Sequence, residues 1–415
     1  MKVLLVQSAT GRREQPVFPL GLAFLAGQLR GHDVRAVDLS LSEGSTAPLT
    51  DEVRSFQPHV IGISLRNIDD SSWPRTHSYV PPFTAAVESL SSWEGTLLAG
   101  GTGFSIYPGR ILDMHPRIDI GIQGEAENVL PVLLSHLEGG ERPGGWDGGR
   151  LLASGRADLE KLSPPDYSMF GLSPYAHGYG IGVQSRRGCP FGCKYCTYGF
   201  LGGEGFRERP VAHVVDDVRR LSEAGAGTFQ FVDSVFNAPT SYTETLLREL
   251  RMADTGMRWA AWPDTDVSVD MLRAMVDAGA EKVDFSPDAI SSRGLRMLGK
   301  KGDPRRLYPL VREARGLGLR TGVNFFNGNP GEGFFSLIRK LAFMAGARLR
   351  LGAADTFVNI GTIRVYAHSR LSVQMIEEGR VPPDCDFWDP VFYLHRGPCD
   401  WLYRLFGLLR KARHG

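Results

Sequence analysis

The feature that most constrains this chain is a run of nine residues, Gly-Cys-Pro-Phe-Gly-Cys-Lys-Tyr-Cys, which ends at Cys196. Three of the five cysteines of the chain lie in this run, at Cys189, Cys193 and Cys196. Their spacing is too tight for a disulfide framework, and three thiolates are one short of a closed zinc site. Three soft thiolates with one position left open suit a 4Fe-4S cluster in which three irons are held and the fourth is free. An incomplete zinc knuckle or a chance grouping of cysteines is the alternative interpretation.

The motif resembles the signature of the radical S-adenosylmethionine superfamily, Cys-x3-Cys-x-aromatic-Cys, and Tyr195 fills the aromatic position. The resemblance implies that the free iron is chelated by the amine and carboxylate of S-adenosylmethionine. It also implies that an electron from the cluster cleaves the sulfonium and releases a 5′-deoxyadenosyl radical. An external electron donor such as flavodoxin or ferredoxin is then an expected partner.

The composition limits the other binding partners that can be expected. The 415 residues are enough for two or three domains, and 47 basic against 46 acidic residues give a formal net charge of +1. This balance provides no electrostatic reason to expect binding to nucleic acid or to a membrane surface. The first apolar run, residues 3–6, is too short for a signal peptide, and no run approaches the length of a membrane span. Clustered cysteines indicate a reducing cytoplasm.

Residues 1–138 alternate strand patterns with helical patterns, which predicts an α/β, doubly wound, Rossmann-like domain. Strands are predicted over residues 1–7, 34–39, 59–65, 96–99 and 118–122. Ligands of such sheets bind beyond the carboxyl ends of the strands. Three strand ends are polar or rich in glycine, and they supply the candidate cofactor contacts Ser8, Ser64, Leu65, Arg66, Asn67, Gly100, Gly101, Thr102 and Gly103.

A doubly wound domain placed before a radical cluster motif resembles the cobalamin-binding domain of cobalamin-dependent radical S-adenosylmethionine enzymes. The resemblance rests on residues 19–21, 31–32 and 100–103, and on the Gly-Glu-Ala-Glu run that begins at Gly124 and Glu125. It implies that the nucleotide tail of cobalamin runs beside the sheet, where a glycine-rich turn makes room for it. The alternative is a Rossmann-like domain that has no ligand or that recognises the substrate.

The cobalt of cobalamin is expected to have no histidine ligand from this protein. The loop after the first strand holds no Asp-x-His-x-x-Gly motif, and His115, in a near match elsewhere, is interpreted as a surface residue. Arg66 is predicted instead to cap the lower face of cobalt, because a guanidinium has no lone pair to donate. Such a cap would disfavour six-coordinate cobalt and ease methyl transfer. The alternative is that Arg66 pairs with Asp69 or Asp70.

The rest of the chain is predicted to form a linker, a second domain and a closing segment. Residues 139–178 are expected to be the linker, because residues 139–150 are rich in glycine. Residues 179–350 repeat a strand–helix pattern, which builds a parallel barrel with its chemistry at the carboxyl ends of the strands. The resemblance specifies a partial (β/α)6 TIM barrel. Its strands are predicted over residues 181–185, 228–232, 258–262, 282–285, 320–326 and 354–360.

Polar residues at these strand ends are candidate contacts with S-adenosylmethionine. The resemblance implies that Asp233 and Ser234 lie near its methionine end and that Asp288 reaches its ribose hydroxyls. Residues 327–332 resemble the family's Gly-x-Pro-Gly-Glu turn near adenine, and the replacement of glycine there leaves a side-chain role open for Asn327. Each of these residues could instead be a turn or helix cap.

Arg207 and Arg209 follow the cysteine motif closely. Their planar guanidinium groups could bind the S-adenosylmethionine carboxylate, a cobalamin amide or an anionic substrate. The alternative is a solvated charged stretch balanced by Glu204 and Glu208.

Residues 351–415 are expected to form a C-terminal extension that closes the barrel. Residues 362–371, 377–380 and 388–393 resemble the end of the same family's barrel, and residues 401–409 are predicted to form an amphipathic helix. Cys385 and Cys399 are too few for a second cluster and are interpreted as inert.

The resemblance, which covers nearly the whole chain, implies a methyltransferase that acts on an unactivated carbon of a small-molecule, natural-product substrate. One S-adenosylmethionine would methylate reduced cobalamin, and a second would supply the radical that removes hydrogen from the substrate. Radical chemistry suits this carbon because it is neither acidic nor nucleophilic. Another radical outcome on the same scaffold is one alternative: a rearrangement, ring contraction, cyclisation or sulfur insertion. A non-catalytic cobalamin or metal carrier is the other.

Overall fold

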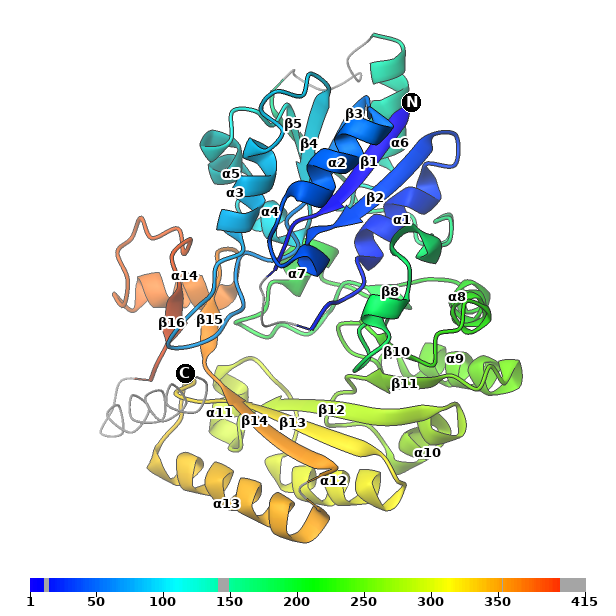
Figure 1. Cartoon of the computed structure of the whole chain (residues 1–415). Helices are drawn as coiled ribbons and strands as arrows, with labels where there is room; N and C mark the ends of the chain where they lie inside the picture. The colour runs from blue at the N-terminus through cyan, green and yellow to red at the C-terminus, as the bar shows by residue number, and fades with distance from the viewer. Residues whose placement is uncertain (11–14, 141–148, 353, 396–415) are drawn as a thin grey trace.

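A computed structural model describes residues 1–10, 15–140, 149–352 and 354–395. Within these residues, two parallel six-stranded sheets lie one above the other (Figure 1). The predicted amphipathic helix at 401–409 and Cys399 lie outside the described residues. Among the helices that are described, none is both long enough and apolar enough to cross a membrane.

The first sheet is parallel and has the strand order β2-β1-β3-β4-β5-β6. Its strands are β1 (Lys2–Gln7), β2 (Asp33–Asp38), β3 (Val60–Ser64), β4 (Thr96–Gly100), β5 (Ile120–Gln123) and β6 (Leu151–Ala153). The chain moves from β1 outward to β2 and then returns past β1 to β3. This reversal makes a topological switch point between β1 and β3, where ligands of doubly wound sheets bind. The predicted fold class is confirmed.

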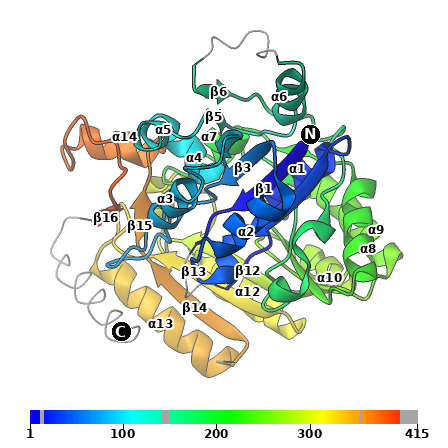
Figure 2. The same ribbon diagram turned by 45° about the horizontal axis from the view of Figure 1, so that its top comes forward.

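Both faces of the first sheet are buried. Alternate residues of a strand point to opposite sides, so each inner strand contributes side chains to two cores. Leu4 and Val6 face the core formed with α2 (Ala47–Phe56), α3 (Val80–Glu88), α4 (Thr102–Ile106) and α5 (Pro108–Met114). Val3 and Leu5 face the core formed with α1 (Leu20–Gln28) and α6 (Val129–Glu138). The helices therefore flank the sheet on both faces (Figure 2), which explains why inner strands such as β1 and β3 are largely apolar.

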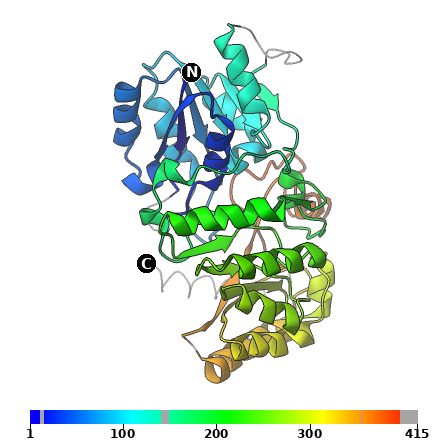
Figure 3. The same ribbon diagram turned by 90° about the vertical axis from the view of Figure 1, so that its right-hand side faces the viewer.

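The second sheet is also parallel, and its order β7-β10-β11-β12-β13-β14 follows the chain. Its strands are β7 (Gly182–Val183), β10 (Thr228–Phe231), β11 (Arg258–Ala261), β12 (Ala280–Asp288), β13 (Arg320–Phe326) and β14 (Thr356–Gly361). The helices between them are α8 (Val211–Glu223), α9 (Thr240–Ala253), α10 (Val269–Asp277), α11 (Ser292–Met297), α12 (Leu307–Gly316) and α13 (Phe334–Leu351). The result is the expected (β/α)6 partial barrel, which lies below the first sheet in Figures 1 and 3.

The boundaries of these units differ from the expected ones in two places. The segment 139–178, expected to be a linker, contributes β6, which pairs with β5 at the edge of the first sheet. Three residues beside a glycine-rich stretch are too few for a strand to be predicted from periodicity. The second sheet extends past residue 350 because β14, which includes most of the predicted strand 354–360, pairs with β13. The short 3-10 helices η2 (Tyr167–Phe170) and η3 (Ser173–Tyr175) lead toward β7.

The end of the described chain connects the two units. It contains β15 (Ile363–Val365), α14 (Arg370–Glu377) and β16 (Val391–Tyr393), with β15 and β16 antiparallel. Arg364 of β15 forms a buried ion pair at 3.1 Å with Asp69, which lies in the loop after β3. The Tyr366 hydroxyl donates to the same carboxylate at 2.6 Å. This segment therefore attaches the first sheet to the second.

Candidate functional site

The three motif cysteines lie in one loop, between β8 (Arg186–Arg187) and α7 (Tyr198–Gly202). All three are half-buried free thiols. Among the described residues, no group of three or more His, Cys, Asp or Glu side chains is arranged to hold a single metal ion. A 4Fe-4S cluster presents three separate irons to its ligands, so its thiolates need not converge on one point.

Burial makes these thiols weak acids. It raises the pKa of Cys193 to about 12 and the pKa of Cys196 to about 11. The Lys300 ammonium opposes this rise at both sulfurs. Buried thiols of this kind become thiolates when a metal supplies positive charge, so the donor set fits an iron–sulfur cluster.

Glycine and two strand-end residues hold the cysteine loop in place. Gly188 has φ +78°, and a Cβ there would lie 2.1 Å from the Gly205 carbonyl oxygen, so only glycine fits. The Ser234 hydroxyl donates to the Gly188 carbonyl at 2.7 Å. The Asp233 carboxylate accepts the backbone N–H of Ser185 at 2.8 Å and the hydroxyl of Ser185 at 2.5 Å. Asp233 and Ser234 thus support the loop, and their contact with S-adenosylmethionine stays a prediction.

Tyr195, the aromatic residue of the motif, is tied to the end of β12. Its hydroxyl donates to the Asp288 carboxylate at 2.5 Å, and the Lys300 ammonium pairs with the same carboxylate at 2.7 Å. Asp288 has φ +63°, which is uncommon for a residue with a side chain. The structure therefore brings two predicted site residues together. Lys300, in a Gly-Lys-Lys-Gly turn, also belongs to this group of residues, and it was not predicted from the sequence.

The turn predicted to lie near adenine follows β13 and is braced by α13. Its Glu332 carboxylate accepts the Gly328 N–H at 2.5 Å and pairs with the buried Lys340 ammonium. Asn327 is 4% exposed, and its Oδ1 has no hydrogen-bond partner among the described residues. A buried polar atom without a partner costs free energy, so it marks a position where a ligand could donate a hydrogen bond. This observation fits the predicted contact between Asn327 and S-adenosylmethionine.

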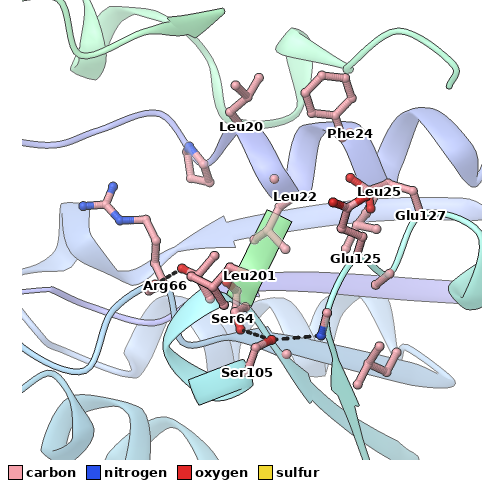
Figure 4. Close-up of a pocket in the computed structure, with 18 of the residues that line it drawn as sticks. Leu20, Leu22, Phe24, Leu25, Ser64, Arg66, Ser105, Glu125, Glu127 and Leu201 are labelled. Atoms are coloured by element: carbon pink, nitrogen blue, oxygen red, sulfur yellow. Dashed lines mark hydrogen bonds between the residues drawn. The ribbon is translucent and has the colours of Figure 1, made fainter. Parts of the chain in front are cut away.

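A cavity of about 580 Å³ lies between the first sheet and the second unit, and its lining includes Gly188 at the start of the cysteine loop. Figure 4 shows the lining beside α1 and around Arg66 and Glu125. One part lies between the sheet and α1 and has apolar walls that include Leu5, Leu22 and Ile122. The other part is bounded by the second unit, through residues such as Gln184 and Tyr198. The predicted site residues that line it are Ser64, Arg66, Asn67, Gly100, Gly101, Thr102, Gly124, Glu125 and Ser234. Those outside its lining are Ser8, Leu65, Gly103, Tyr195, Arg207, Asp233, Asp288, Asn327 and the three cysteines.

Arg66 is a half-buried residue of the cavity wall, and its side chain extends away from the glutamates at the other end of the cavity in Figure 4. Asp69 accepts hydrogen bonds from Arg364 and Tyr366, and Asp70 accepts them from backbone N–H groups. In the described part of the chain, no ion pair or hydrogen bond involves the Arg66 guanidinium. The alternative that Arg66 pairs with Asp69 or Asp70 is therefore wrong.

The glycine-rich turn after β4 packs against the loop that carries Arg66. Gly101 has φ +102°, and a Cβ there would lie 2.5 Å from the Leu65 carbonyl oxygen. A Cβ on Gly103 would lie 2.7 Å from the carbonyl carbon of Asn67. Because these contacts are with backbone, side chains at either position would push the two loops apart. The turn therefore lets two loops of the cavity wall approach closely, besides leaving room for a ligand.

Two glutamates after β5 form ion pairs with arginines of the second unit. Arg207 donates to Glu125 at 3.1 Å, and Arg187 pairs with Glu125 at 3.1 Å and with Glu127 at 2.5 Å. Arg187 also lies over the Phe24 ring, 5.4 Å from its centroid. Burial raises the pKa of Glu125, but the two arginines hold it below its usual range. Glu125 and Arg207, predicted separately as cofactor contacts, therefore bind each other across the domain interface.

Two sequence interpretations are wrong about exposure. His115, interpreted as a surface residue, is 5% exposed, and its ring packs against Phe83 with centroids 5.5 Å apart. Burial lowers the pKa of His115. Arg209, considered as part of a solvated stretch, is buried and pairs with Asp217 at 2.7 Å. In both cases the partner comes from another element, so local charge and polarity could not predict the burial.

Two protein-family models match this chain. The model described as a B12 binding domain matches residues 7–134, and the model described as the radical SAM superfamily matches residues 183–339. The first range contains β3 and β4 with the Arg66 loop, and the second contains the cysteine loop and the strands β10 to β13.

Curated relatives and a solved structure extend the likeness across both domains. A Pyrococcus horikoshii protein named as an uncharacterized methyltransferase is 25% identical over 353 residues, which are 80% of this chain and 75% of its own. Cytidylyl-2-hydroxyethylphosphonate methyltransferase from Streptomyces wedmorensis is 26% identical over 400 residues, which are 79% of this chain and 73% of its own. The radical S-adenosylmethionine methyltransferase TsrM from Kitasatospora setae, solved with tryptophan and an S-adenosylmethionine analogue, superposes with a TM-score of 0.79. That superposition covers 91% of this chain and 76% of TsrM at 20% identity, and it shows a shared fold.

Proposed function

We propose that this chain, a cobalamin-dependent radical S-adenosylmethionine enzyme by its two domains, is a methyltransferase acting on an unactivated carbon of a small molecule. The observation that carries the proposal is a cavity whose lining includes both Arg66 of the B12-binding domain and Gly188, where the cysteine loop of the radical domain begins. The matched relatives named as methyltransferases share both domains. When bound, cobalamin supplies a transferable methyl group, and S-adenosylmethionine at the 4Fe-4S cluster supplies an organic radical.

The residues that would hold the two cofactors fall into two groups, one lining the cavity and one outside its lining. Cys189, Cys193 and Cys196 would hold three irons, and their loop is fixed by Gly188 and Ser234. The unpartnered Asn327 oxygen would accept a hydrogen bond from S-adenosylmethionine. Apolar walls beside α1 would enclose the nucleotide tail of cobalamin and exclude water from it.

Arg66 is assigned to the lower face of cobalt. It lies in the cavity wall at the switch point of the first sheet, and its guanidinium forms no ion pair with a carboxylate of the described chain, although Asp38 is near enough to attract it. A cation there donates no electron pair, so it would keep cobalt from gaining a lower ligand. Because this cavity reaches Gly188 at the start of the cysteine loop, cobalamin bound in it would lie near the radical source, and such proximity favours their reaction.

The partners follow from composition and chemistry. A net charge of +1 favours a small-molecule substrate over nucleic acid. An oxygen-sensitive cluster and free cysteines favour a reducing cytoplasm, with an external one-electron donor such as flavodoxin or ferredoxin as the expected partner. The natural-product class of the substrate rests on the relative that methylates a phosphonate nucleotide conjugate, as its name states.

The test uses the full chain, reconstituted without oxygen with iron, sulfide and hydroxocobalamin. Methyl-deuterated S-adenosylmethionine and titanium(III) citrate are added, and the bound cobalamin is extracted for mass spectrometry. We expect about four irons and one cobalt for each chain, cobalamin that carries the deuterated methyl group, and 5′-deoxyadenosine in solution. Formation of 5′-deoxyadenosine without labelled cobalamin would overturn methyl transfer and favour another radical outcome. Binding of cobalamin without 5′-deoxyadenosine would favour a carrier.

A further inference from the structure

The segment that follows α11 lies directly against the cysteine loop. The Lys194 N–H donates to the Leu298 carbonyl at 2.9 Å. A Cβ on Gly299 would lie 2.6 Å from the Gly192 carbonyl oxygen, so the two backbones are in close contact. Lys300 is the next residue, and its side chain therefore starts beside the loop that holds the cluster ligands.

The Lys300 side chain is buried, with an exposed fraction of 11%, and its ammonium is fixed by two partners. It pairs with the Asp288 carboxylate at 2.7 Å and donates to the Ser286 carbonyl. Tyr195, two residues after Cys193, donates its hydroxyl to the same carboxylate at 2.5 Å. The Asp288 carboxylate is thus held beside the cluster site by a hydrogen bond from the motif, and it holds the Lys300 ammonium there in turn.

These charges act on the cluster ligands in opposite directions. Lys300 follows Gly299, whose backbone contacts Gly192, and Asp288 accepts a hydrogen bond from Tyr195, so both charges lie beside the loop that carries the cluster ligands. A cation there favours added negative charge on the cluster, and an anion disfavours it. Reduction adds one negative charge to a cluster, and net charge near the cluster is one of the factors that set its potential. The site is poorly solvated, so screening of these charges is weak.

We propose that Lys300 and Asp288 are positioning residues that set the reduction potential of the cluster, Lys300 raising it and Asp288 lowering it. Tyr195 keeps the Asp288 carboxylate in place between the cluster loop and Lys300. The proposal rests on the 4Fe-4S cluster of the proposed function but not on methyl transfer, so it applies to any radical reaction at this site.

The test is a potentiometric titration of the reconstituted full chain, followed by electron paramagnetic resonance of the reduced cluster, without S-adenosylmethionine. Lys300→Met is expected to shift the midpoint potential below that of the parent. Asp288→Asn is expected to shift it above the parent, because Lys300 then lacks its counter-charge. Lys300→Arg keeps the cation, and Tyr195→Phe keeps both charges, so both should shift the potential much less.

Opposite shifts are the distinguishing result, since general damage to the loop would move both variants the same way. Iron and sulfide are counted in every sample, and cobalamin is left out, so failure of methyl transfer does not affect the outcome. If Lys300→Met does not hold the cluster, Lys300→Gln and Asp288→Asn carry the comparison. Shifts of one sign for the cation and anion variants, or unchanged potentials with full iron content, would overturn the proposal.

Discussion

At the scale of a residue, Arg66 is an arginine in the cavity wall that forms no ion pair with a described carboxylate. We predict that Arg66→Ala lets water reach the lower face of cobalt. The visible spectrum of the bound cobalamin should then shift toward a six-coordinate form, and methyl transfer should slow by about tenfold or more, equal to about 1.4 kcal/mol of barrier. Arg66→Lys retains the positive charge and should lie closer to the parent. An alanine variant that holds and transfers the methyl group as well as the parent would contradict the assignment.

At the scale of an element, the turn after β4 sets the position of the Arg66 loop. We predict that Gly103→Ala destabilises the protein by about 2 kcal/mol and weakens cobalamin binding, because its Cβ would meet the Asn67 backbone at 2.7 Å. Urea unfolding and cobalamin titration measure the two effects. The matched control is Gly109→Ala in α5, where a Cβ meets nothing within 4 Å. If both variants had the same stability and cobalamin affinity, the close approach of the two loops would contribute nothing measurable to either quantity.

At the scale of the whole molecule, buried ion pairs fix the position of one domain relative to the other. We predict that Glu125→Gln costs about 3 kcal/mol, because Arg187 and Arg207 lose their shared partner in a buried interface. In the folded protein the pKa of Glu125 lies below its usual range. The ion pairs therefore stabilise the parent fully at a pH above the pKa of Glu125 in the unfolded chain. This stabilisation is lost as the pH falls through the lower pKa of Glu125 in the folded protein. Unfolding measured from pH 7 to pH 4 should therefore show a weaker acid dependence in the variant.

Asp216→Asn, in the exposed pair with Arg219, is the control and should change stability by less than about 0.5 kcal/mol. A loss as small as that of the control would mean that the domains are held by apolar contacts.

The amino-acid sequence by itself determined the chemistry and the order of the elements. Cys189, Cys193 and Cys196 lie in a single loop, so their spacing predicts a cluster site without reference to the rest of the chain. The strands were predictable because alternation of apolar runs and helical patterns is a local property. Their polar ends then pointed to the Arg66 loop and to the turn at Asn327, both of which lie at carboxyl ends of parallel strands.

Only the tertiary structure decided which partner each charged side chain takes. Glu125 and Arg207 are 82 positions apart in the chain, and Asp69 and Tyr366 are 297 apart, yet each pair is in direct contact. The burial of His115 likewise could not be predicted from neighbouring residues, nor could the position of Lys300 beside the cysteine loop. The physical reason is that ion pairing and burial depend on distances between elements, which folding sets and local patterns do not contain.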